Sequence, residues 1–149
     1  MCYLRPMREP PPAHAGFLGT WLLMPETCIY EQGAPPRAGS YRIEDEGEAL
    51  RFTIAWTAAD GSTHEVTFAG RPDGVAVPFA GGDAVDAMSI TLVSPRDLRS
   101  AAFWRGQERM VAQRQLDARG DAMRVTQVVR FADGTRAANV AVYRRHAPS

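Results

Sequence analysis

Short runs of alternating apolar and polar residues follow one another along most of the chain, and each run ends at a cluster of Gly, Pro, Asp or Asn. Residues 50–56 carry apolar side chains at every even position, and the turn 59–61 follows them. Residues 62–70 alternate in the same way and stop at 72–74. Because successive side chains of a strand point to opposite faces of a sheet, this period of two predicts β-strands.

The whole chain yields about nine or ten such runs, and the turn signals lie about 8–12 residues apart. This spacing is typical of a meander in which each strand pairs with the next. Helical periodicity is weak, and the best place for one short helix is 26–33. The expected strands are 16–24, 40–46, 50–56, 62–70, a short piece at 75–79, 85–93, 98–105, 108–116, 122–131 and 136–145.

Two all-β architectures explain this alternation, an antiparallel up-and-down barrel and a two-sheet sandwich. An open sheet of this size would leave two long edges that invite aggregation, whereas a barrel removes them. The connections are short and lack the long crossovers that a sandwich usually needs. We therefore predict an all-β fold, a barrel of about 8–10 antiparallel strands, although periodicity alone does not separate the two.

One domain accounts for most of the chain. Residues 1–15 are rich in proline and have no periodicity, which predicts a disordered or loosely attached arm. Residues 16–149 then form a single barrel domain. A chain of 149 residues is long enough to bury roughly 68–70% of the surface that it exposes when unfolded.

Charge and cysteine content exclude several classes of partner. The chain has 17 basic and 17 acidic residues, so we expect no broad attraction to nucleic acid or to an anionic membrane. Cys2 and Cys28 are expected to be free thiols. No signal peptide core or membrane span is recognisable, which predicts a cytoplasmic protein, or a secreted or periplasmic one if a leader has been removed. The oligomeric state stays open, a homodimer included.

No motif identifies a reaction. The histidines, His14, His64 and His146, are scattered and lack the spacing of a zinc site, so we expect neither a metal nor a cofactor. A nucleophile elbow, a P-loop and a dinucleotide-binding fingerprint are all missing from the sequence, and we assign no catalytic residue.

The two ends of the expected barrel carry a family resemblance. Gly19-Thr20-Trp21 opens the first strand, and a basic residue, Arg144, follows the tyrosine of the last strand. This pattern resembles the lipocalin and calycin superfamily. The order of segments over about 16–145, including 33–36, 58–61 and 139–143, is more closely similar to a group of small, uncharacterised bacterial lipocalin-like proteins. The resemblance implies that Gly19, Trp21 and Arg144 are structural, with the tryptophan plugging the barrel base beneath the arginine.

Such barrels can enclose one small ligand among apolar walls with a few polar groups. His64 shares the apolar face of Val66 and Phe68, which predicts that it points into the lumen. A lumenal arginine would favour a carboxylate-bearing ligand, but a register slip of one residue would turn it outward. The candidate ligand-binding residues are Trp56, His64, Phe68, Trp104, Arg114 and Gln127.

Three functional hypotheses follow. The first is a binding protein for a small hydrophobic or amphipathic molecule. The alternative is an enzyme on the same scaffold, of the isomerase, cyclase or hydratase type, using an acid or base such as His64 or Glu65. The third is an interaction module whose lumen is filled by its own side chains, which a cavity measurement tests.

Overall fold

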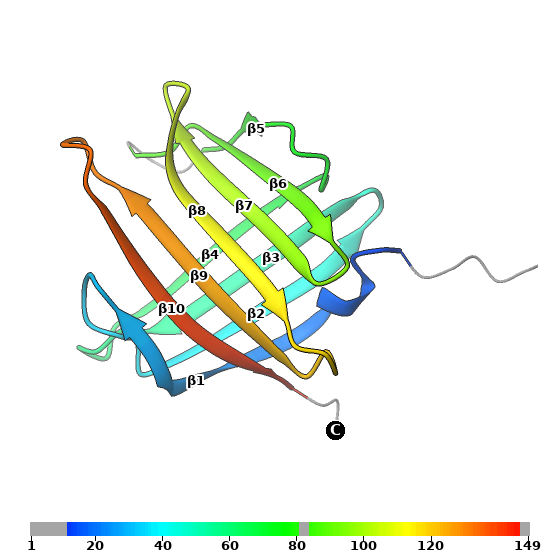
Figure 1. The fold of residues 1–149 in the computed structure, drawn as a ribbon, viewed down its shortest axis with the longest axis horizontal. Coiled ribbons are helices and arrows are strands. Elements are labelled where there is room, and N and C mark those ends of the chain that lie inside the picture. Colours follow the sequence, from blue (N-terminus) through cyan, green and yellow to red (C-terminus); the bar gives the residue numbers. More distant parts are fainter. Residues whose placement is uncertain (1–11, 81–83, 147–149) are drawn as a thin grey trace, which may run out of the picture.

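The fold was obtained as a computed structural model, which describes residues 12–80 and 84–146. Figure 1 shows a single sheet that curls into a barrel, with one turn of 3-10 helix, η1, before the first strand. The elements are η1 (Ala15–Phe17), β1 (Gly19–Tyr30), β2 (Ala38–Glu46), β3 (Ala49–Thr57), β4 (Thr63–Gly70), β5 (Val77–Pro78), β6 (Ala87–Ser94), β7 (Asp97–Trp104), β8 (Gln107–Leu116), β9 (Ala122–Arg130) and β10 (Arg136–Arg145).

The ten strands form one antiparallel sheet in the order β4-β3-β2-β1-β10-β9-β8-β7-β6-β5. Each strand therefore pairs with its sequence neighbour, except across the seam between β4 and β5, and the ladder from β1 to β10 nearly closes the ring. The predicted up-and-down barrel is confirmed, and the sandwich alternative is wrong because one continuous sheet holds every described strand.

The short helix that we expected at 26–33 does not form. Residues up to Tyr30 continue β1, and the ladder with β10 resumes at Ile29 after an irregularity that begins at Met24. Within the irregular stretch, the Thr27 hydroxyl donates to the Met24 carbonyl and accepts the Val142 N–H at 2.8 Å. A side chain thus replaces missing ladder bonds, so the backbone stays extended where weak periodicity suggested a helix.

The base of the barrel holds the tightest packing. Phe17 of η1 and Trp21 of β1 are both fully buried, and the Trp21 indole N–H donates to the Phe17 carbonyl at 3.0 Å. Burying each such side chain contributes roughly 1.5–3 kcal/mol. The described part of the expected arm is anchored as well, because the His14 ring bonds the Asp45 carboxylate at 2.6 Å. The rest of that arm, 1–11, lies outside the described residues.

The arginine over Trp21 is Arg145, and the implied role of Arg144 does not match its position. The guanidinium carbon of Arg145 lies 4.2 Å from the Trp21 ring centroid, whereas Arg144 is exposed. The register explains the difference, because Arg145 is the cross-strand partner of Trp21 and shares its inner face. Gly19 has a φ of +120°, and a Cβ there would lie 3.2 Å from Arg145 Nη1. The glycine therefore makes room for this arginine.

Candidate functional site: a lumenal cavity with a buried arginine

A cavity of about 490 Å³ occupies the lumen above this base. Its outermost lining residues, among them Ala34, Ala58 and Val85, belong to the connections after β1, β3 and β5. The cavity therefore opens at the end of the barrel where these connections lie. Figure 1 shows the connections after β1 and β3 at the opposite end of the barrel from η1. Its size falls within the roughly 300–1,000 Å³ that small-molecule sites occupy. A lumen filled by its own side chains is thereby excluded.

Arg114 on β8 is the most deeply buried polar group of the cavity wall, with 1% of its surface exposed. Its Nη1 donates to the Ser100 hydroxyl at 3.1 Å, and its Nε has no hydrogen-bond partner among the described residues. No ion pair between described residues includes it. An uncompensated buried charge costs several kcal/mol, so this arginine is a strong hydrogen-bond donor that lacks an acceptor.

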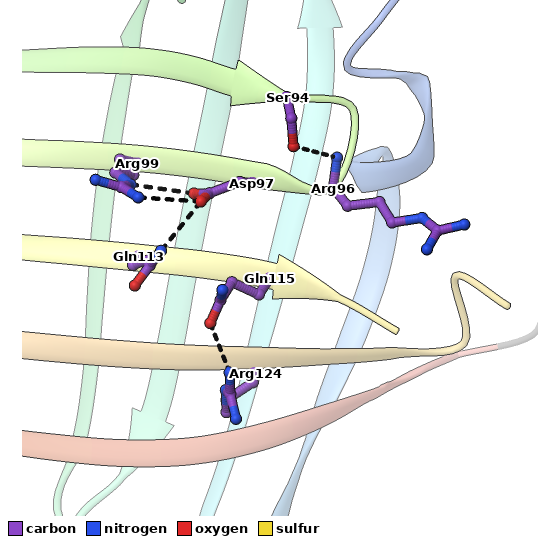
Figure 2. Close-up of polar contacts among 7 residues, drawn as sticks. All are labelled: Ser94, Arg96, Asp97, Arg99, Gln113, Gln115 and Arg124. Atoms are coloured by element: carbon purple, nitrogen blue, oxygen red, sulfur yellow. Dashed lines mark hydrogen bonds and ion pairs between the residues drawn. The ribbon is translucent and has the colours of Figure 1, made fainter. Parts of the chain in front are cut away.

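The neighbours of Arg114 on β8 show the opposite situation. Gln113 and Gln115 point to the outer face of the barrel, and Figure 2 shows both with partners. Gln113 donates to Asp97 at 3.0 Å, and Gln115 accepts from Arg124 at 2.8 Å. The alternation of β8 thus places satisfied polar groups outside and the unsatisfied guanidinium inside.

Aromatic rings surround the guanidinium. Its carbon lies 4.8 Å from the Phe52 ring centroid and 5.4 Å from that of Tyr41, distances typical of cation–π contacts. Tyr41 in turn packs edge-on against Tyr143, with ring centroids 4.9 Å apart. These faces stabilise the positive charge but accept none of its in-plane N–H bonds. The rings therefore leave Nε without a hydrogen-bond partner among the described residues.

The tyrosines that line the cavity are hydrogen-bond donors. Burial raises the pKa of Tyr143 well above its usual value, with further contributions from Tyr41, Tyr30 and Cys28, and the opposing effect of Arg114 does not cancel them. Burial, together with Cys28 and Tyr41, also raises the pKa of Tyr30. Both phenols therefore stay protonated at neutral pH. Both also line the cavity, so their O–H groups can donate to an acceptor there.

Four of the six predicted ligand-binding residues line the cavity together, namely Trp56, Phe68, Arg114 and Gln127. Trp104 does not line it and carries Arg105 over its ring instead, 5.3 Å from the ring centroid. Sequence reasoning missed Tyr30, Tyr41, Tyr143 and Ser100. One signal was available for Tyr41, because it lies two residues from the core residue Ile43 and therefore on the same face of its strand.

His64 lies outside the cavity, contrary to the expected lumenal position. It is exposed at the rim, stacks on Trp56 with centroids 5.2 Å apart, and its Nε2 lies 3.0 Å from the Ser62 hydroxyl. A hydrogen bond from that hydroxyl lowers the pKa of Asp60, so Asp60 is ionised and takes the single hydroxyl proton. His64 must therefore donate to Ser62, and it cannot act as a base toward it.

None of the groups of His, Cys, Asp and Glu in 12–80 and 84–146 is arranged to hold a metal ion. Nor does any helix in these ranges have the length and hydropathy to cross a membrane. Cys28 is a free, half-buried thiol whose pKa is raised by burial and by Glu26.

No protein-family model and no curated protein sequence matches the chain. Solved structures do. A fatty acid binding protein of Schistosoma mansoni in complex with arachidonic acid shares 15% identity, covers 91% of this chain and 99% of its own, and has a TM-score of 0.57. The zebrafish ileal bile acid-binding protein complexed with cholic acid shares 12% identity over 88% and 99%, with a TM-score of 0.51. At such low identity the likeness establishes the fold alone: the chain is an antiparallel up-and-down β-barrel whose fold is similar to that of these two proteins.

Proposed function

We propose that this protein binds a small amphipathic acid in the barrel lumen, with the carboxylate at Arg114 and the apolar body directed toward the mouth. The observation that carries the proposal is the buried guanidinium, whose Nε has no partner among the described residues. A carboxylate accepts two parallel N–H bonds from a guanidinium, and it would also neutralise the buried charge. No neutral hydrophobic ligand offers this compensation.

The rest of the wall suits the remainder of such a ligand. Toward the mouth the cavity is lined by apolar side chains such as Ile54, Val66, Phe79 and Val85. The Tyr143 hydroxyl, kept protonated by burial, adds a donor near the arginine. Both solved structures described above hold an amphipathic acid, arachidonic or cholic acid, which supports the same class here.

Fluorescence titration with anilinonaphthalene sulfonate, followed by displacement with hexadecanoate, tests the proposal. Native mass spectrometry of the purified protein then identifies any co-purifying acid. The lumen is blocked by Ala112→Phe, because Ala112 is buried and lines the cavity. The matched control is Val111→Phe, one residue earlier on the same strand and facing outward.

We expect hexadecanoate to displace the probe from the native protein and from Val111→Phe, and to bind Ala112→Phe at least about tenfold more weakly. Thermal unfolding establishes that both variants fold. Equal binding to both folded variants, or displacement by hexadecanol as effectively as by hexadecanoate, would contradict the proposal.

A further inference from the structure

A second set of polar groups lines the lumen, and their backbone positions lie nearer the mouth than that of Arg114. In the sheet register, Tyr30 on β1 lies opposite Asn139 on β10, and Asn139 lies opposite Gln127 on β9. Gln127 lies opposite Ala112 on β8, and Ala112 opposite Ser100 on β7. All five line the cavity. Apart from Ala112 this row is polar across the strands, and we call Tyr30, Ser100, Gln127 and Asn139 the polar belt.

The position of the belt relative to Arg114 follows from strand geometry. Arg114 and Ala112 are two residues apart on β8, and both side chains face the lumen. Two residues of a strand span roughly 7 Å. The Arg114 side chain spans this distance, because its Nη1 donates to the hydroxyl of Ser100, a belt residue, at 3.1 Å. A ligand that places its carboxylate at Arg114 therefore has the polar belt beside the first few atoms of its body.

Two belt residues are already engaged by the protein. The Asn139 amide holds the chain after β1, accepting from the backbone N–H groups of Glu31 and Gln32 and donating to the Gln32 carbonyl. The Ser100 hydroxyl accepts from Arg114. These two contacts give the belt a structural role as well.

The other two belt residues have unused capacity. The Gln127 amide N–H donates to the thioether of Met110, a weak acceptor, and its carbonyl oxygen accepts no hydrogen bond from a described residue. The Tyr30 hydroxyl makes no hydrogen bond within the described part of the chain. Burial raises its pKa, so the group stays protonated and can donate. Polar groups in an apolar wall are costly unless water or a ligand satisfies them.

We infer that the lumen selects an amphipathic acid that carries a hydroxyl or carbonyl oxygen on one of the chain atoms near its carboxylate. The inference rests on the proposed function and narrows its substrate class, because an unsubstituted alkyl chain would displace water from Gln127 and Tyr30 without replacing its hydrogen bonds. A ligand hydroxyl donates to the Gln127 carbonyl and accepts from the Tyr30 O–H, which satisfies both.

The test compares three acids by isothermal titration calorimetry: hexadecanoic acid, its derivative with a hydroxyl on one of the first few chain carbons, and the derivative with a methyl group at that same carbon. The methyl compound is the matched control for size. The protein variants are Gln127→Leu, Tyr30→Phe and the outward-facing control Thr126→Val, next to Gln127 on β9.

We expect the native protein and Thr126→Val to bind the hydroxy acid about tenfold more tightly than the methyl acid. Gln127→Leu and Tyr30→Phe each reduce this ratio by at least half. A native ratio near one, or a ratio that neither variant changes, overturns the inference and leaves the proposed function standing. Failure of all three acids to bind the native protein overturns both.

Discussion

Two arginines on the inner face of the barrel have opposite surroundings. Arg145 at the base donates to three backbone carbonyls, those of Gly16, Leu18 and Gly120, and lies over the Trp21 ring. Arg114 in the lumen donates to one serine hydroxyl and leaves Nε without a partner in the described chain. The fold provides acceptors for the guanidinium of Arg145, whereas it leaves one N–H donor of Arg114 without an acceptor.

On the proposed function, this difference distinguishes a structural arginine from a ligand-binding one better than residue type or burial does. A guanidinium that the fold satisfies costs little and contributes stability, as at the base. A guanidinium that the fold surrounds with rings but does not satisfy lowers the stability of the empty protein. An external anion that accepted hydrogen bonds from this guanidinium would offset that cost.

The largest expected effect on stability is that of Arg145→Met. The change removes three donors from backbone carbonyls and uncovers Trp21, so we expect the free energy of unfolding to fall by about 3 kcal/mol. Urea denaturation measures it. The neighbouring exposed residue provides the control, since Arg144→Met is expected to change stability by less than about 0.5 kcal/mol. An equal loss in both variants would remove the distinction between the two positions.

The opposite sign is expected for Arg114→Met. Replacing an unpaired buried charge by an apolar side chain of similar length relieves desolvation, partly offset by the lost contacts with Phe52 and Tyr41. We expect the ligand-free protein to gain about 1–2 kcal/mol. Denaturation of delipidated protein is the appropriate measurement, because bound ligand would stabilise only the native arginine form. A loss above about 1 kcal/mol would mean that Arg114 is satisfied in the empty lumen.

A smaller effect concerns the outer face, where the polar groups have partners (Figure 2). Partial burial raises the pKa of Asp97, but hydrogen bonds from Arg99 and Gln113 outweigh it, and the pKa lies below its ordinary value. A lowered folded-state pKa contributes stability above the unfolded value, and that stability is lost as the pH falls through the folded one. We therefore expect Asp97→Asn to lose roughly 0.5 kcal/mol less of its free energy of unfolding than the native protein when the pH falls below about 4. Identical acid unfolding curves would show that these bonds add nothing.

The sequence predicted the fold closely, because each strand of the meander is bounded by turn residues and shows its own alternation. The sequence also named Trp56, Phe68, Arg114 and Gln127 as candidates for the lumen, and all four line the cavity, but it left the parity of the strands open. It could not place His64, because facing inward at the rim does not mean entering the cavity. The choice between Arg144 and Arg145 depended on the register with β1, which is a long-range property. The polar belt likewise depends on register across five strands and has no local signal.

The proposed carboxylate site is tested most directly by a double comparison of ligand and protein. Calorimetric affinities are measured for hexadecanoate and for hexadecanamide, which has nearly the same shape without the charge. Each ligand is titrated into the native protein and into Arg114→Met. We expect the substitution to weaken hexadecanoate binding about 30-fold or more and to leave hexadecanamide within about threefold. Equal losses for the two ligands, or no loss for hexadecanoate, would contradict the assignment of Arg114 as the carboxylate site.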